Sequence, residues 1–251
     1  MHTQKSRFNC YMPAAVEYPD PMELATLFPA DITSLPAHSR PASRTGCVKH
    51  LFDSHLLEYP TALLNTIIED SEKKLPAGVL HSLHDYVPWV YTHSVNVALA
   101  SLLIAERFDY RNAALHDIGL GAFLHDIGKL MVPKTILEKQ GPLDQQEMIF
   151  MRQHCLMGIS IVKDSGLSQA STAVIVQHHE RMDGSGYPYG LDAAHIHRSS
   201  QIVMVSDVFE ALTSHRPYRP AYDKDTALSI MENEAHRFPA DVISMLKTLL
   251  K

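Results

Sequence analysis

Apolar side chains recur at near-helical spacing along most of the chain, and no segment shows sustained alternation of apolar and polar residues. An apolar residue at about every third or fourth position forms one face of a helix, whereas a half-buried strand needs a period of two. The pattern therefore predicts an all-α protein built as a helical bundle.

The first well-patterned segment extends from residue 51 to residue 74. Pro60 lies inside this segment and lacks the backbone N–H that a helix interior requires, so it predicts a break or a kink. We interpret the segment as a hairpin of helices at the start of the bundle. Its apolar residues at near-helical spacing are Leu56, Leu63, Leu64, Ile67 and Ile68.

Proline and glycine divide the rest of the chain into segments of helical length. Six of the 15 prolines precede residue 48, in a stretch with weak periodicity. We predict that residues 1–48 form a Pro-rich N-terminal arm or a small accessory unit, and that residues 49–251 form the helical domain.

Composition restricts the partners and the location. The chain has 251 residues, of which 45% are hydrophobic and 20% charged, so it can bury a sizeable core. Its net charge of -6 does not favour duplex nucleic acid, although a local basic cluster can still bind a small phosphate ligand. The three cysteines are scattered, and we find neither a secretion signal nor an apolar run of about 18 residues. We therefore expect a cytoplasmic protein without a membrane span.

Histidine is unusually frequent, at 16 residues, and several histidines lie in apolar segments of helical length. Imidazole and carboxylate groups are the ligands expected for Zn, Mn, Fe or Ni, and a bundle can bring them together from separate helices. The candidate metal ligands are His93, His125, Asp126, His154, His178, His179 and Asp207.

The candidate ligands can also be explained by roles other than metal binding. A single histidine in an apolar helix, such as His93 or His154, is more often a hydrogen-bonded core residue than a ligand. The adjacent His178 and His179 could coordinate two neighbouring metals, because consecutive helical residues point in directions about 100° apart. Histidine pairs also occur on surfaces. Asp207 is stronger evidence, because its helix is otherwise apolar and an unpaired buried carboxylate is costly. The order and spacing of the whole set favour a metal site more than any single residue does.

The sequence HDIG occurs twice, and only one copy can face a central site. His116 and Asp117 precede His125 and Asp126 by nine residues, which corresponds to a rotation of roughly 180° around a common helix. Lys129 follows the second copy, whereas a leucine occupies the equivalent position after the first. We assign the metal site to the second pair and interpret the first as a surface or helix-start pair.

These motifs, taken in order, resemble a known family. The residues that carry the resemblance are His93, HDIGK at 125–129, His154, HHERMDGSGYP at 178–188, Asp207 and RPYR at 216–219. They resemble the HD-GYP subgroup of the HD-domain phosphohydrolases. The resemblance implies an HD-domain helical bundle as the catalytic domain. It also implies that the seven candidates bind iron or manganese and that Asp126 bridges two ions.

One position departs from the family pattern. Some members carry a glutamate four residues before the first histidine ligand, where it supports a third metal ion, and this chain has Trp89 there. An indole has only an N–H donor and cannot coordinate a metal. We therefore expect two divalent transition-metal ions, iron or manganese, with nickel, zinc or cobalt as alternatives.

Asp126, Lys129 and Asp183 are the candidate catalytic residues. Lys129 lies one helical turn after Asp126 and could hold a phosphate oxygen, the alternative being a solvated lysine at a helix end. Arg216 and Arg219 could clamp a second phosphate, although without the resemblance they would be ordinary surface residues.

The glycine-rich segment at 183–188 must turn out of its helix beside the histidine pair. Tyr187 could stack on a guanine or hydrogen-bond to it, and Asp183 could order Lys129 or a water at the metals. The plain alternative is a tight loop that only ends the helix. The resemblance also implies that this loop contacts diguanylate cyclase domains.

The function implied is hydrolysis of cyclic di-GMP. Two cations that share Asp126 would lower the pKa of a water between them and neutralise charge on the phosphoryl oxygens. We expect linear pGpG as the product, with GMP as the alternative. Two other functions remain open. One is a related HD phosphohydrolase acting on another cyclic dinucleotide or a nucleoside phosphate, and the other is a non-catalytic scaffold that binds nucleotide or a cyclase.

Overall fold

The computed structural model describes residues 51–215 and 220–251, so the predicted unit at residues 1–48 lies outside the described residues. Within those ranges all regular elements are helical, with a single isolated β-bridge between Asp183 and Asp192, and the predicted all-α class is confirmed. The elements are α2 (Ser54–Lys74), α3 (Val79–Tyr86), α4 (Pro88–Arg107), α5 (Asn112–Leu124), the 3₁₀ helix η1 (Ile127–Met131), α6 (Lys134–Leu137), α7 (Gln145–Arg152), α8 (His154–Val162), α9 (Gln169–Gln177), α10 (Arg198–Thr213), α11 (Lys224–Asn233), the 3₁₀ helix η2 (Ala235–Arg237) and α12 (Ala240–Leu249).

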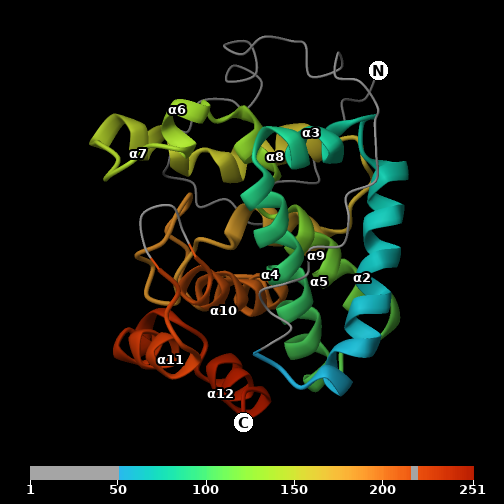
Figure 1. Cartoon of the computed structure of the whole chain (residues 1–251), viewed down its shortest axis with the longest axis vertical. Coiled ribbons are helices and arrows are strands. Elements are labelled where there is room, and N and C mark those ends of the chain that lie inside the picture. The colour runs from blue at the N-terminus through green and yellow to red at the C-terminus, as the bar shows by residue number, and fades with distance from the viewer. Residues whose placement is uncertain (1–50, 216–219) are drawn as a thin grey trace.

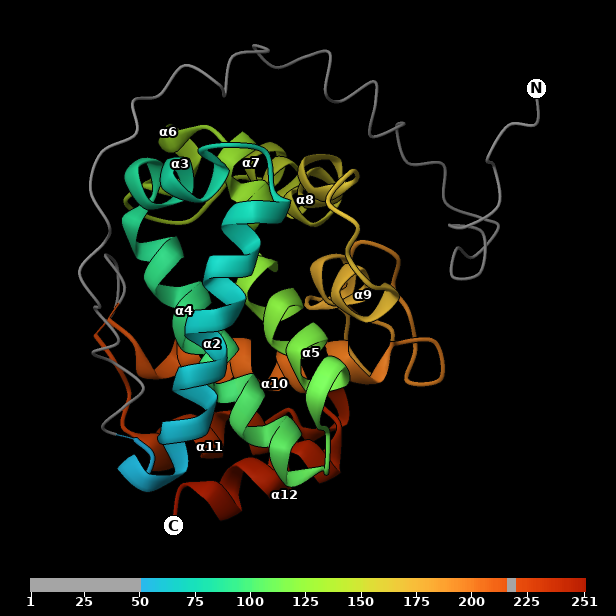
Figure 2. The same ribbon diagram turned by 90° about the vertical axis from the view of Figure 1, so that its right-hand side faces the viewer.

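Helix α4 forms the centre of the bundle. It packs against α2, α3, α5, α10 and α12, and it runs alongside α2 and α5 (Figures 1 and 2). Every position from His93 to Ala105 is buried, as expected for a helix that is covered on all sides. His93 is the one titratable residue in this buried stretch, so the central helix carries a predicted metal ligand into the core.

The prediction of a helical hairpin at residues 51–74 is wrong, because this segment forms the single helix α2 with Pro60 inside it. A proline removes one hydrogen bond from the helix interior. The ring of Pro60 is buried on the same helix as Leu57, Leu64 and Ile67, and α2 packs against α4 and α5. Burial of this apolar face offsets the lost hydrogen bond.

The remaining helices lie at the two ends and on one side of this core. Helices α3 and α6 to α8 gather at one end, and α11 and α12 lie at the other (Figure 1). Helix α9 packs on α5, and α10 packs on α4 and α9. Chain segments that are far apart in the sequence therefore meet where α4, α5, α8, α9 and α10 converge.

None of the described helices is, by itself, both long and apolar enough to cross a membrane. The pair α3 and α4, which is bent by 115°, meets the length and composition criteria when the two helices are taken together.

Candidate metal centre

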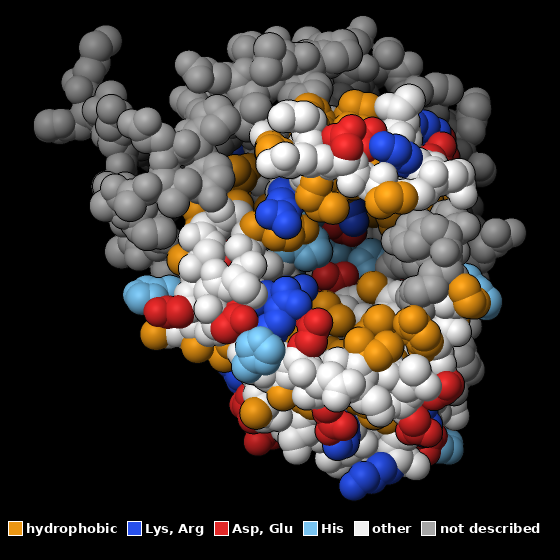
Figure 3. Space-filling view, turned by 90° about the vertical axis from the view of Figure 1, so that its left-hand side faces the viewer, with side chains coloured by type: hydrophobic (Ala, Val, Ile, Leu, Met, Phe, Trp, Pro, Cys, Tyr) orange, Lys and Arg blue, Asp and Glu red, His pale blue; other side chains and the backbone are white. Residues whose placement is uncertain are grey.

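The structure brings all seven predicted ligands together below a hollow in the surface. Histidine and acidic side chains are visible in this hollow, and lysine or arginine side chains lie at its rim (Figure 3). In each of two groups the ligand atoms all lie within 4.8 Å of one another. The first cluster is His93, His125 and Asp207, and the second cluster is Asp126, His154, His178 and His179.

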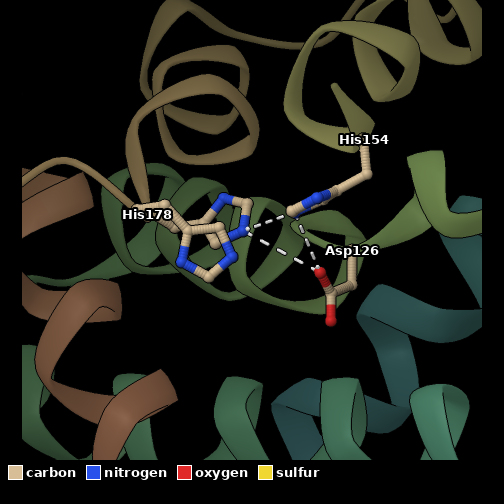
Figure 4. Close-up of side chains that lie close together, drawn as sticks. Asp126, His154 and His178 are labelled. Carbon is tan, nitrogen blue, oxygen red and sulfur yellow. Dashed lines mark hydrogen bonds and ion pairs between the residues drawn. The ribbon is translucent and has the colours of Figure 1, made fainter. Parts of the chain in front are cut away.

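Asp126 belongs to the second cluster and also faces the first. Its Oδ1 is 3.3 Å from Nε2 of His154 and 3.8 Å from Nε2 of His178 (Figure 4). Its Oδ2 is 3.4 Å from Nε2 of His125 and 3.6 Å from Nε2 of His93. A carboxylate whose two oxygens face different sets of ligands has the geometry needed to bridge two cations.

Asp207 makes a second link between the clusters. Its Oδ1 lies 3.0 Å from Nε2 of His93, and its Oδ2 lies 3.8 Å from Nδ1 of His179. The apolar helix α10 therefore directs this buried carboxylate at the imidazoles of His93, His125 and His179, so Asp207 is not left unpaired in the core.

Three of the ligand histidines lie at or beside helix ends, where their rings bond to the backbone. In each case Nδ1 lies within hydrogen-bond distance of a carbonyl in the last turn of α5, α7 or α9, and such carbonyls lack an intrahelical donor. A carbonyl only accepts, so Nδ1 carries the hydrogen and the lone pair of Nε2 faces the cluster. The pairs are His125 with Ala122 at 2.7 Å, His154 with Met151 at 2.7 Å and His178 with Ile175 at 3.0 Å.

Glu210 is a site residue that the sequence analysis missed. Its Oε2 accepts a hydrogen bond from Nδ1 of His93, while its Oε1 accepts from Asn96 at 3.1 Å and from Ser214 at 2.6 Å. A buried carboxylate behind a ligand histidine fixes the ring orientation and raises the basicity of the ligand. The sequence did hold a signal, because Glu210 lies one helical turn after Asp207 in the same apolar helix.

Close backbone packing explains why the residue two positions after Asp126 is a glycine, Gly128. A Cβ at this position would lie 1.9 Å from the carbonyl oxygen of His154 and 2.5 Å from the backbone nitrogen of Gly158. Any other residue would therefore hold η1 away from α8. The close approach of the two elements places Asp126, just before η1, beside His154, the first residue of α8.

Burial keeps the second cluster ready to bind a cation. It lowers the pKa of His154 to about 4 and holds the pKa values of His178 and His179 well below the ordinary range, so all three rings are neutral near pH 7. Burial opposes ionisation of Asp126, but the charge of Lys129 and the neighbouring histidines hold its pKa well below the ordinary range. Neutral imidazoles and an ionised carboxylate are the forms that bind metals.

His93 in the first cluster differs from these rings. Burial works against its charged form, but the carboxylates of Glu210 and Asp207 raise its pKa to about 9. The same contact with His93 helps to hold the pKa of Asp207 well below the ordinary range, in spite of burial. A cation in the first cluster must therefore displace a proton from His93.

Two buried atoms support the presence of a cation at this site. Nε2 of His125 and Oδ1 of Asp126 are buried and have no hydrogen-bond partner. Buried polar atoms of this kind are costly unless something satisfies them. The donor set of imidazoles and carboxylates suits a divalent transition metal, and Asp126 faces both clusters. The residues present therefore fit two such ions.

Lys129 lies at the edge of the centre. Its Nζ is 2.5 Å from Oδ2 of Asp126 and 5.5 Å from the centroid of the Trp89 ring. The segment after Asp126 is a 3₁₀ helix, in which residues three apart lie one above the other. The sequence spacing predicted that Lys129 and Asp126 share a face of an α-helix. The structure brings them together through a 3₁₀ helix instead.

The first HDIG copy lies away from both clusters. Nε2 of His116 is 3.8 Å from Oδ2 of Asp70 on α2, and Nδ1 of His116 is 3.9 Å from Asp117. Helix α5 ends at Leu124, so the second copy begins where the helix ends rather than continuing a common helix. Asp126, and not Asp117, faces the predicted ligands.

The glycine-rich loop folds back against the centre. The ring of Tyr187 stacks on that of His179, with centroids 4.7 Å apart and planes inclined by 29°. Behind the loop, the buried Glu180 accepts hydrogen bonds from the backbone of Tyr189 at 2.7 Å and of Leu191 at 2.9 Å. Glu180 therefore anchors the loop, and Tyr187 becomes part of the wall of the site.

Asp183 belongs to neither metal cluster and interacts with Ser185 of this loop and with His236. Its Oδ1 accepts hydrogen bonds from the backbone and the hydroxyl of Ser185, and its Oδ2 lies 3.5 Å from Nε2 of His236. The expected contact with Lys129 is not made, since the ammonium of Lys129 pairs with Asp126. Arg216 and Arg219 lie outside the described residues.

Comparison with known proteins gives the same picture. A model of the HD domain family matches residues 79–242. The cyclic di-GMP phosphodiesterase response regulator RpfG of Xanthomonas campestris pv. campestris is 39% identical over 131 residues, which cover 51% of this chain and 35% of that protein. The 3'3'-cGAMP-specific phosphodiesterase 3 of Vibrio cholerae serotype O1 is 36% identical over 149 residues, which cover 59% of this chain and 32% of that protein. The chain thus spans about a third of the length of these curated relatives.

A solved structure shares the fold. Bd1817, an HDG"Y"P protein from Bdellovibrio bacteriovorus, matches with a TM-score of 0.54 at 22% identity, over 64% of this chain and 52% of that one. The family match begins in α3, ends in α12 and includes all seven ligands of the two clusters. By its matched length and its metal centre, the chain belongs to the HD domain family.

Proposed function

We propose that this protein is a metal-dependent phosphodiesterase that hydrolyses a cyclic dinucleotide, with cyclic di-GMP as its substrate. The observation that carries the proposal is the position of Asp126, whose two oxygens face two separate His and Asp clusters. Several relatives support the substrate class, because their names specify cyclic di-GMP or 3'3'-cGAMP phosphodiesterase activity.

Two divalent cations, when bound, supply a nucleophile by lowering the pKa of a water, and they stabilise charge on the phosphoryl oxygens. The second cluster, which includes Asp126, would hold one cation, and the first cluster together with Asp126 would hold the other. Lys129 would then exchange its contact with Asp126 for a non-bridging oxygen of the scissile phosphate. The ring of Tyr187, already stacked on His179, offers an aromatic wall for a guanine base.

Linear pGpG is the product that we propose, since Trp89 offers no carboxylate for a third metal ion. The indole instead lies near the ammonium of Lys129. We further propose a cytoplasmic location, with which the free and buried Cys155 agrees, and contacts between the loop at 183–188 and diguanylate cyclase domains. We propose iron or manganese for the two bound ions.

Anaerobic purification, metal analysis and chromatography of the products from cyclic di-GMP would test this proposal. We expect about two iron or manganese ions per chain and accumulation of pGpG. Cyclic di-AMP and 3'3'-cGAMP are suitable comparison substrates. Absence of bound metal after anaerobic loading, or of turnover on any cyclic dinucleotide, would favour the non-catalytic scaffold instead. Rapid formation of GMP without pGpG would overturn only the proposed product.

A further inference from the structure

We infer that Arg152 binds the second phosphate of the substrate, the one that is not being cleaved, and that the ring of Tyr187 supports its guanidinium group. This inference rests on the proposed function. The family resemblance pointed to Arg216 and Arg219 for this phosphate, but both lie outside the described residues. Arg152 belongs to neither the family motifs nor the metal clusters, and it lies over the ring of Tyr187. The evidence is a series of contacts that leads from His179 at the metal centre, through the ring of Tyr187, to the exposed Arg152.

Two ring contacts make up this series. The guanidinium carbon of Arg152 lies 5.1 Å from the centroid of the Tyr187 ring. That ring in turn stacks on His179, with a centroid separation of 4.7 Å. His179 belongs to the second cluster, so the ring of Tyr187 connects Arg152 with a candidate metal ligand.

Among the described residues, none occupies the hydrogen-bond donors of Arg152, so these donors are available to a ligand. A guanidinium that lies over an aromatic ring is attracted to it through its charge and does not use up its N–H donors. Arg152 is exposed, and within the described ranges its side chain forms no hydrogen bond or ion pair. In contrast, Arg181 donates to the backbone of His178 and Glu180.

The backbone that carries Arg152 is fixed relative to the metal centre. Arg152 is the last residue of α7, whose start is held by a capping box between Asp144 and Glu147. The next to last residue, Met151, accepts a hydrogen bond from Nδ1 of His154 at 2.7 Å. The helix end that positions a metal ligand therefore also positions Arg152.

The chemistry of the substrate explains why a cation is needed here. A cyclic dinucleotide has two phosphodiester groups, each with one negative charge. The metal cations can neutralise only the group that is cleaved, so the other requires a positive group some distance away. A guanidinium edge matches two phosphate oxygens at once, which a lysine ammonium cannot do.

The test compares substrates with one and two phosphates on the metal-loaded protein. Cyclic di-GMP has two phosphodiesters, whereas bis(p-nitrophenyl) phosphate has only one. We expect Arg152→Ala to raise KM for cyclic di-GMP about 10- to 100-fold and to leave kcat/KM for bis(p-nitrophenyl) phosphate unchanged. Arg152→Lys should recover only part of the loss. Metal content should match the unchanged protein in both variants.

Arg111→Ala is the matched control, because Arg111 is an exposed arginine that pairs with Asp109 and lies outside the metal centre. It should alter neither reaction. The alternative role for Arg152 is a favourable charge at the C-terminal end of α7, which would change the melting temperature but not KM.

An unchanged KM for cyclic di-GMP in Arg152→Ala would overturn the inference while leaving the proposed function intact. An equal loss on both substrates would also overturn it, since Arg152 would then act on the metal centre. If the unchanged protein does not cleave cyclic di-GMP, the proposed function fails, and the inference fails with it.

Discussion

Replacing Gly128 with alanine would test whether the backbone contact between η1 and α8 sets the metal centre. The added Cβ would lie 1.9 Å from the carbonyl oxygen of His154 and 2.5 Å from the nitrogen of Gly158. Both are backbone atoms, so no side-chain rotation can relieve the overlap. Restoring an ordinary contact of 3.4 Å requires the two elements to separate by about 1.5 Å.

That displacement is large compared with the tolerance of a metal site. His154 begins α8, and its Nε2 now lies 3.3 Å from Oδ1 of Asp126. Metal–ligand distances vary by only about 0.2 Å, so Gly128→Ala should remove His154 from the second cluster. Changes behind a ligand already cost about 10- to 100-fold in affinity, so the loss of a ligand should cost about 100-fold or more. The first cluster should keep its ion.

The assay is elemental analysis after anaerobic loading, together with thermal unfolding. Gly119→Ala is the matched control, because its Cβ would lie 2.6 Å from Ile67 Cδ1 and 2.7 Å from Leu102 Cδ2, which are ends of flexible side chains. Its overpacking should cost about 1–3 kcal/mol of stability without moving a ligand. If Gly128→Ala binds two ions with unchanged affinity, the close backbone contact does not determine the geometry of the site.

Three further predictions concern single side chains. Asp126→Ala should abolish binding of both ions, whereas Asp117→Ala should leave both; elemental analysis with the reverse pattern would contradict the choice between the HDIG copies. Lys129→Ala should lower kcat/KM on cyclic di-GMP by about one to two orders of magnitude with both metals retained, and near-normal turnover would exclude its phosphate contact. Glu210→Gln should lower the pKa of His93 from about 9, so that calorimetry in several buffers near pH 7.5 should detect fewer protons released on metal binding. An unchanged proton release would show that Glu210 does not set the charge of His93.

The fold class and the set of candidate ligands could be predicted because both depend on residue type and spacing. The apolar periodicity indicated helices throughout, and the described residues confirm it. The choice of the second HDIG copy rested on Lys129, which follows it, and the structure places Asp126 at the clusters and His116 beside Asp70. Rotation around a common helix does not apply, because α5 ends at Leu124.

Features that depend on tertiary contacts could not be predicted in the same way. The missing backbone N–H of Pro60 predicted a break in the helix, but the packing of α2 against the core compensates for the lost hydrogen bond. The expected contact of Asp183 with Lys129 required knowledge of the loop conformation, in which Ser185 and His236 engage the carboxylate.

The hydrogen bonds that orient the ligand rings could not be predicted from the sequence either. Three of the rings bond to backbone carbonyls, which every residue possesses and which leave no trace in residue identity. Glu210 does leave a trace, but a glutamate in a helix is common, and only its contact with His93 reveals its role.

This difference in anchoring separates three ligand rings whose orientation is robust to mutation from one, His93, whose environment can be tuned. No side-chain substitution at Ala122, Met151 or Ile175 removes the carbonyl that orients a ligand, so drift at these positions leaves that orientation in place. His93 instead depends on the side chain of Glu210, which one substitution can change to a neutral or a shorter group. Selection, or an engineer, can therefore adjust metal preference in the first cluster through Glu210 while the second cluster keeps its coordination.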